Sequence, residues 1–258
     1  MTALIALAHF TLRRAFTGKR MISALLLLCI APLMSVVLCT SGGLAGDDVF
    51  HRLMIFLVTW LSAMLLSLIY AIALTSSEIE DGTASFVLLA ALPKWLVVLV
   101  QTVVTAAGLS LMAAGSTAVM WGIVRMIGRE PLPEAVLLWR YPFVTSAAIL
   151  AYLSVFTFWG YAFRRGYAAS IAVAIVVEAM IVTMPMKFAA YTITNNVRGL
   201  ILSLALEGDP GPYFSYSLGM YDFPTYGQGA FFLSVVVGLS LCAAMVTIMN
   251  KSLVRATE

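Results

Sequence analysis

The sequence predicts an all-α protein that crosses a membrane several times. Of its 258 residues, 62% are hydrophobic and only 10% are charged, whereas an average soluble domain is about half apolar and about a quarter charged. The mean hydropathy of +1.01 is too high for a water-soluble domain, and high hydrophobicity with low charge also excludes intrinsic disorder. The apolar stretches do not alternate over ten-residue blocks, so they predict helices and not a barrel.

Six apolar stretches are long enough to cross the bilayer, because a helix needs about 20 residues for the roughly 30 Å hydrocarbon core. The predicted spans are Met21–Thr40, Leu53–Thr75, Trp95–Ile123, Pro142–Phe163, Tyr167–Met184 and Ala230–Asn250. Only Arg164, Arg165 and Gly166 separate the fourth span from the fifth, so we expect a tight hairpin there. Residues 1–258 are interpreted as one membrane domain.

Residues 1–20 predict an amphipathic helix that lies on the membrane surface. Polar and basic side chains share one half of a helical wheel: His9, Arg13, Thr17 and Arg20. Most apolar residues fall on the other half, as in interfacial helices. The alternative is a positively charged leader that simply flanks the first span. Either interpretation keeps the N-terminus in the cytoplasm.

The distribution of basic residues predicts the orientation of the chain. The flank before the first span carries Arg13, Arg14, Lys19 and Arg20, whereas the flank after it carries only Arg52. Positively charged flanks stay on the cytoplasmic side, and the first span usually dominates insertion. With six spans, both termini are therefore expected in the cytoplasm.

The outer connection between the last two spans, Pro185–Gly229, is too apolar for a free loop. We expect short re-entrant or interfacial helices within Phe188–Thr194 and Val197–Leu206, covered by the Gly- and Pro-rich stretch Asp209–Gly229.

The residue types that support catalysis or cofactor binding are sparse. A phosphate-binding P-loop ends in Gly-Lys-Ser/Thr, but only Lys19 follows a glycine and Arg20 comes next. His9 and His51 are too far apart to predict a zinc or haem site. The net charge of +3 is modest and does not suggest nucleic acid. We therefore expect a chain that is not an enzyme and holds no cofactor.

The cytoplasmic loop 76–94 contains the most informative segment. It begins with an acidic group followed by Gly and Thr: Glu78, Glu80, Asp81, Gly82 and Thr83. A helix-compatible run, Ala84–Leu92, comes next and stops at Pro93. Asp81 or Thr83 can cap that helix, and carboxylates at a helix start favour its positive dipole end.

The apolar side chains of this short helix predict a contact. Phe86, Leu88 and Leu89 would form an apolar face in water next to charged residues, and such surfaces usually mark partner sites. The alternative is a helix that rests on the membrane interface.

The segment resembles the permeases of type-2 ATP-binding-cassette (ABC) exporters. The resemblance rests on Glu78–Thr83, Phe86–Leu89 and Leu92–Lys94. It extends in outline to the N-terminal helix, the six spans and the outer helices between spans five and six, and it is nearest to the subgroup with a separate ATPase subunit. In that family a variable residue often separates Leu-Pro from the basic residue, whereas Lys94 follows Pro93 directly.

The resemblance implies a permease in the bacterial cytoplasmic membrane, acting as a dimer of this chain with two copies of a cytoplasmic ATPase subunit. ATP and Mg would bind to the ATPase subunits. The ATPase-coupling residues would be Glu78, Glu80, Asp81, Gly82, Thr83, Phe86 and Leu89. The alternative is a membrane anchor or assembly scaffold that recruits a cytoplasmic partner without transport. A secondary transporter is less favoured, because no inverted repeat is visible.

Glu178 is the acidic residue that lies deep inside a predicted span. A charge in lipid costs at least about 2.5 kcal/mol, so such residues tend to face a cavity or a partner. We predict a role in the translocation path or at a dimer contact. The alternatives are a protonated acid bonded to a neighbouring helix and a span that lies shallower than drawn.

Small residues predict a packing surface on the third span. Gly108, Gly115 and Gly122 recur every seven residues, and stripes of small residues let membrane helices approach closely. We expect this stripe to pack within the chain.

Overall fold

The computed structural model describes residues 2–41, 44–80, 92–163, 166–180, 190–207 and 224–255. These residues form helices and turns without a β-strand; one isolated bridge joins Ala45 and Arg129. Five helices are long and apolar enough to cross a membrane: Arg20–Ser41, Gly46–Thr75, Lys94–Ile127, Leu137–Ala162 and Tyr226–Asn250. The prediction of an all-α, multi-pass membrane protein is therefore confirmed.

The N-terminal helix α1 (Thr2–Ala15) packs against the bundle before the chain turns into α2 (Lys19–Ser41). The turn contains Gly18 with φ +72°, a conformation that favours glycine. Thr11 and Ala15 are buried, whereas Leu4 and Ile5 are exposed. His9 and Arg13 are exposed as well, so the outward side of α1 carries both apolar and polar residues.

The second span begins earlier than predicted. The helix runs without a break through α3 (Gly46–Leu53), the π-helical segment η1 (Met54–Ser62) and α4 (Ala63–Glu80). Asp47 and Asp48 lie in its first turn, where carboxylates stabilise the helix dipole. Residues 46–52, which lie before the predicted second span, are thus helical.

Helix α7 (Leu137–Ala162) is the centre of the bundle. It packs against α4, α6 (Lys94–Ile127) and α11 (Tyr226–Arg255). α7 starts five residues before the predicted Pro142, which lies inside the helix. Gly160 on α7 touches Thr75 on α4, and any side chain at Gly160 would collide with it. The missing side chain lets these two helices approach closely.

The small-residue stripe on α6 packs within the chain at one position only. A side chain at Gly108 would collide with Phe16, so this glycine makes room for the aromatic ring. Among the described residues, Gly115 and Gly122 have no neighbour within 4 Å of a side-chain position. For these two glycines the prediction of intrachain packing is wrong, because α6 turns this part of the stripe away from its neighbours.

The fifth predicted span is described from Gly166 to Met180. It comprises α8 (Gly166–Ala172), with seven residues, and the π-helical η2 (Val173–Met180), with eight. The remainder of Tyr167–Met184 lies outside the described residues.

The outer connection contains one described helix, α9 (Ile193–Leu204), within the region predicted to form outer helices. Residues Ile193 to Ile201 are all buried, mainly against α7, η1 and α11. Of the stretch Phe188–Thr194, only its last residues are described. Most of Asp209–Gly229 lies outside the described residues, and α11 begins within it at Tyr226.

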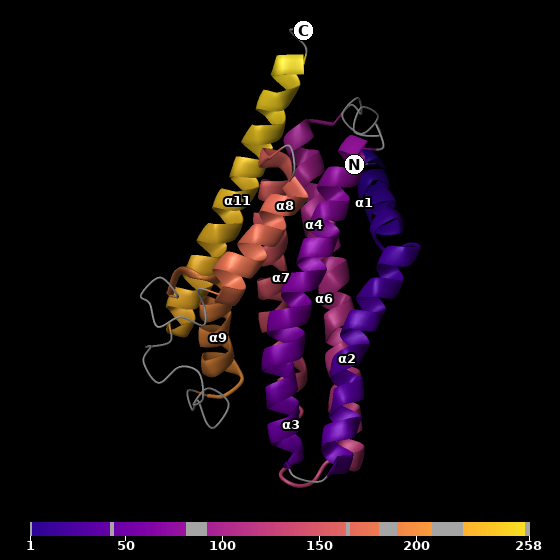
Figure 1. Cartoon of the computed structure of the whole chain (residues 1–258), viewed down its shortest axis with the longest axis vertical. Coiled ribbons are helices and arrows are strands. Elements are labelled where there is room, and N and C mark those ends of the chain that lie inside the picture. Colours follow the sequence, from indigo (N-terminus) through magenta and orange to yellow (C-terminus); the bar gives the residue numbers. More distant parts are fainter. Residues whose placement is uncertain are drawn as a thin grey trace.

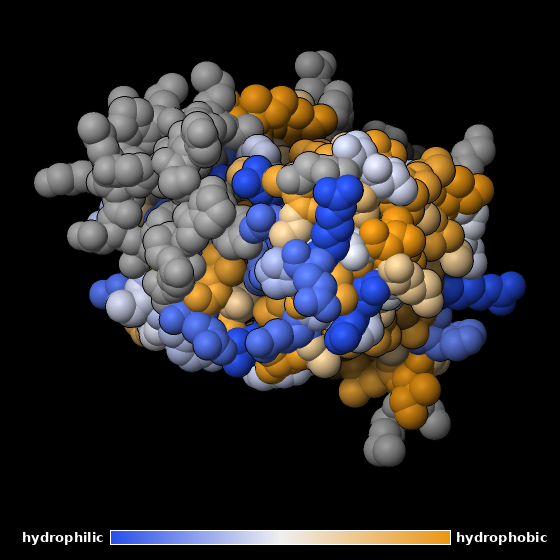
Figure 2. Space-filling view, turned by 90° about the horizontal axis from the view of Figure 1, so that it is seen from below, coloured by the Kyte–Doolittle hydropathy of each residue, from blue (hydrophilic) through white to orange (hydrophobic). Residues whose placement is uncertain are grey.

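The helix ends gather at two opposite ends of the bundle (Figure 1). The N-terminal end, at the top of the view, holds α1, the end of α4, the start of α6 and the last residues of α11. The far end, at the bottom, holds the starts of α3 and α7 and the end of α6. Figure 2 looks onto the far end: hydrophilic residues gather on this face, and hydrophobic surface borders them.

Candidate functional site

The strongest concentration of buried polar contacts surrounds Glu178 at the end of η2. Glu178 is 3% exposed. Its Oε1 accepts the backbone N–H of Ile193 at 3.0 Å, and its Oε2 accepts the backbone N–H of Thr194 at 2.9 Å. A helix leaves its first N–H groups without intrahelical partners, and its positive dipole end attracts anions. Glu178 therefore caps α9 from a different segment of the chain.

Two hydroxyl groups complete the surroundings of the carboxylate. The hydroxyls of Thr194 and Tyr152 donate to Oε2 of Glu178 at 2.6 and 3.1 Å, and they lie 2.8 Å from each other. With two backbone N–H groups and two hydroxyls pointing at it, this carboxyl is suited to the ionised form. Thr192 finishes the cap by accepting the N–H of Asn195 at 3.2 Å.

The elements around Glu178 explain why these residues meet. Tyr152 lies on the central helix α7 and is 1% exposed, and a buried tyrosine usually finds a partner for its hydroxyl. The two π-helical segments, η1 and η2, flank the cluster: η1 supplies Thr59 and Trp60, and η2 supplies Glu178. Single π turns in helices frequently occur at functional sites.

A small cavity of about 10 Å³ adjoins this polar cluster. Its polar lining consists of Thr59, Trp60, Tyr152, Thr194 and Arg198, and aliphatic residues complete it. Trp60 Nε1 is buried and has no hydrogen-bond partner within the described part of the chain. A cavity of this size has room for about one water molecule.

Arg198, in the second turn of α9, brings a positive charge to the cavity. It is 8% exposed. Burial lowers the pKa of its guanidinium from the usual value, and the electrostatic effects of Tyr152 and Glu178 raise it. The usual pKa of an arginine side chain is so high that the guanidinium stays charged. The positive Arg198 and the carboxylate of Glu178 therefore balance each other inside the bundle.

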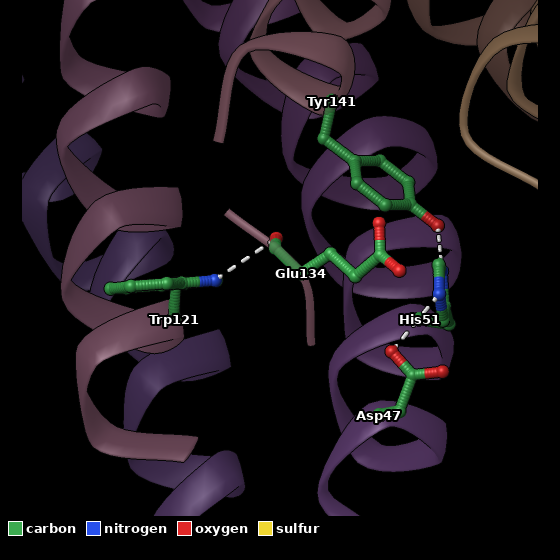
Figure 3. Close-up of polar contacts among 5 residues, drawn as sticks. All are labelled: Asp47, His51, Trp121, Glu134 and Tyr141. Carbon is green, nitrogen blue, oxygen red and sulfur yellow. Dashed lines mark hydrogen bonds and ion pairs between the residues drawn. The ribbon is translucent and has the colours of Figure 1, made fainter. Parts of the chain in front are cut away.

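A second polar group lies at the far end, where α3 packs on α7 (Figure 3). Nδ1 of His51 lies 2.5 Å from the hydroxyl of Tyr141, and Nε2 of His51 lies 3.3 Å from Oδ1 of Asp47. With the ring proton on Nε2, toward Asp47, Nδ1 accepts the Tyr141 hydroxyl. The Glu134 side chain points toward this group in Figure 3. Trp121 Nε1 donates to the Glu134 carbonyl at 3.3 Å.

Sequence reasoning missed the His51 group. The available signal was the spacing of Asp47 and His51, which places both on one helix face four residues apart. That signal has meaning only on a helix, and the sequence predicts that the second span begins only at Leu53. Tyr141, 90 positions from His51, could be found only from the packing of α3 on α7.

Further polar contacts join the second span to α7 along its length. The hydroxyls of Thr59 and Thr145 lie 3.1 Å apart, and the Ser67 hydroxyl donates to the Ile149 carbonyl at 3.2 Å. Such hydrogen bonds hold helices together where lipid gives no hydrophobic driving force. The second span and α7 are thus linked from the far end to the middle of the bundle.

The predicted ATPase-coupling residues lie away from Glu178. The backbones of Glu78 and Glu80 form the last turn of α4 at the N-terminal end. The other coupling residues lie outside the described residues: Asp81, Gly82, Thr83, Phe86 and Leu89. Within the described ranges, no group of three or more His, Cys, Asp or Glu side chains is arranged to hold a metal ion.

The fold and the polar cluster define a class of protein: an all-α, multi-pass membrane protein with a charge-balanced cluster inside its helical bundle. Comparison with protein-family models, with curated proteins and with solved structures finds no match for this chain.

Proposed function

We propose that the chain is the permease subunit of an ATP-driven ABC exporter, working as a dimer with two copies of a separate ATPase subunit. The observation that carries the proposal is the acidic Gly-Thr segment Glu78–Thr83 at the junction of two membrane helices. Helix α4 ends at Glu80 and α6 begins at Lys94, both at the N-terminal end where α1 also lies (Figure 1). An ATPase bound there would pull directly on two spans.

The continuity of the second span supports this role. From Gly46 to Glu80 the chain is one uninterrupted helix, and a helix moves as a unit because its backbone hydrogen bonds are internal. Its contacts with α7, including Thr59 with Thr145, would carry a displacement from the coupling segment into the bundle. Transport requires that the ATPase bind one state of this bundle better than the other.

In this proposal the segment Tyr167–Met184 completes a set of six spans. Both termini lie in the cytoplasm, and the membrane is the cytoplasmic membrane of a bacterium. Glu178 holds α9 in the wall of the translocation path, beside the cavity that contains Arg198. The exposed apolar side chains of α2 and α11, such as Leu26 and Phe231, face lipid and the second copy.

The proposal is tested by isolating the full chain from its native membrane in mild detergent. The wild-type chain should carry an ABC-type ATPase subunit and ATPase activity with it. Replacing Glu80 and Asp81 by Lys should remove most of both, because an acidic docking segment becomes basic. The matched control replaces Glu130 and Glu134, two exposed acids at the far end, by Lys, and it should retain the ATPase.

Recovery of the ATPase with the Glu80→Lys, Asp81→Lys chain would contradict the coupling assignment. A partner that is not an ATPase, bound through the same segment, would favour the alternative of a membrane anchor or scaffold.

A further inference from the structure

Arg198 is a cation inside the bundle that needs a hydrogen-bond acceptor. It is 8% exposed, and it lies on α9 beside the cavity that adjoins Glu178. Its guanidinium carries five N–H donors. Within the part of the chain that the structure describes, Tyr152 and Glu178 act on this group electrostatically, and none of its N–H groups donates a hydrogen bond. Buried donors are normally paired, because an unpaired donor costs free energy of desolvation.

The second span brings another buried donor to the same cavity. Nε1 of Trp60 is buried and has no hydrogen-bond partner among the described residues. Trp60 and Arg198 both line the cavity. Trp60 belongs to η1 and Arg198 to α9, so the two donors reach the cavity from different helices. Two donors beside one cavity indicate that a common acceptor lies between them.

Two hydroxyl groups of the cavity wall can only accept hydrogen bonds from a group in the cavity. The hydroxyls of Tyr152 and Thr194 lie within hydrogen-bond distance of Oε2 of Glu178 and of each other. Each hydroxyl has one proton, and both protons are used inside this cluster, so oxygen lone pairs remain for a ligand. The cavity therefore offers donors from Trp60 and Arg198 together with two acceptor oxygens.

Size, charge and the donor–acceptor pattern identify the ligand as a water molecule. The cavity of about 10 Å³ has room for about one water, and a buried water makes about three hydrogen bonds as donor and acceptor. An anion would face the lone pairs of both hydroxyls. It would also add a negative charge that no group compensates, because Arg198 already balances Glu178. We propose that one ordered water occupies this cavity, accepts hydrogen bonds from Arg198 and Trp60, and donates to the hydroxyl oxygens of the Glu178 cluster.

The water joins the second span to the outer helix α9. Through it, Trp60 of η1 is connected to Arg198 and to the carboxylate cluster of Glu178. Hydrogen bonds through a water are nearly as favourable in enthalpy as direct ones. The link exists whether or not the chain transports a substrate.

The direct test observes the indole N–H proton of Trp60 by nuclear magnetic resonance, in the purified full chain labelled with ¹⁵N-tryptophan in detergent. Loss of its signal in Trp60→Phe assigns the resonance. A rotating-frame Overhauser experiment should show a cross-peak from this proton to water, with the sign opposite to that of chemical exchange. Val197→Ile adds one carbon atom at the cavity wall and should remove the cross-peak. The matched control Val124→Ile adds the same atom at a buried position on α6 and should keep it.

Thermal unfolding in detergent tests whether Trp60 and Arg198 share the ligand. Trp60→Phe and Arg198→Gln should each lower the unfolding midpoint by about 2–4 °C. Together they should lower it by less than the sum, because either change alone already weakens the binding of the shared water. The control pair combines Arg198→Gln with Trp121→Phe, which also loses an indole donor, and its two effects should add. All variants are compared for monodispersity before measurement.

Three results would overturn the proposal. One is the absence of a water cross-peak at the Trp60 indole proton, or its persistence in Val197→Ile. Another is an additive effect of Trp60→Phe and Arg198→Gln. The third is a saturable rise of the wild-type unfolding midpoint with sodium chloride but not with sodium gluconate, lost in Arg198→Gln, which would assign the cavity to an anion.

Discussion

The carboxylate of Glu178 accepts the backbone N–H of Thr194 at 2.9 Å, although the two residues are 16 positions apart and belong to different helices. The contact ties the end of η2 to the start of α9. Because Tyr152 of α7 also donates to Glu178, three elements meet at one carboxylate. Glu178 is thus a structural anchor for α9, and its place in the translocation path remains a prediction.

Substitutions of Glu178 should destabilise the protein whether or not they keep its shape. Glu178→Gln retains one oxygen acceptor but turns an amide N–H₂ toward a donor, and it should cost about 1–3 kcal/mol of unfolding free energy. Glu178→Leu leaves the backbone N–H groups of Ile193 and Thr194 without an acceptor and should cost more. Thermal or denaturant unfolding in detergent measures both. If Glu178→Gln unfolds like the wild type, the carboxyl is protonated and the ionised assignment is wrong.

The contact between Gly160 and Thr75 should make α7 sensitive to one added methyl group. Gly160→Ala collides with Thr75 and should destabilise the bundle by about 1–3 kcal/mol, the usual cost of overpacking. Gly115→Ala makes the same change at a helical position with no neighbour within 4 Å. It should be neutral or stabilising, since Ala favours a helix over Gly by about 0.5–1 kcal/mol. Similar unfolding midpoints for the two variants would contradict the close approach of α4 and α7.

Loss of the Tyr141 hydroxyl should weaken the packing of α3 on α7. Tyr141→Phe removes the hydroxyl that bonds to His51 Nδ1 inside the bundle, at a cost of about 1–3 kcal/mol. Tyr191→Phe is the matched control, because that side chain is 72% exposed. Unfolding in detergent compares the two variants. A Tyr141→Phe protein as stable as the control would show that the His51 contact contributes nothing.

Single cysteines should report which end of the bundle faces the outside. In a background without the three native cysteines, an impermeant maleimide should label Glu130→Cys in intact cells. Thr17→Cys should react only after lysis. Both positions are exposed, one at the far end and one between α1 and α2. The reverse pattern would invert the orientation and place the coupling segment beyond the reach of a cytoplasmic ATPase.

How much of the fold was predictable differs between individual elements. The spans at Arg20–Ser41 and Lys94–Ile127 agree with prediction within a few residues, because an uninterrupted apolar run marks a membrane helix directly. The start of the second span was wrong by seven residues, because the polar residues before Leu53 resemble a loop. They are helical because Asp47 and Asp48 suit a helix start and His51 finds Tyr141 in the bundle.

The sequence by itself determined that this protein is helical and lies in a membrane. Its apolar content is too high for a protein surrounded by water. In lipid, each backbone N–H and C=O group must find its hydrogen-bond partner within a helix. The sequence also singled out Glu178 as a buried charge. Only the tertiary structure decided what that charge binds, because its donors come from Tyr152, Ile193 and Thr194 on two other helices. Helical periodicity reports which residues share a face of one helix, whereas the packing of separate helices determines which faces meet.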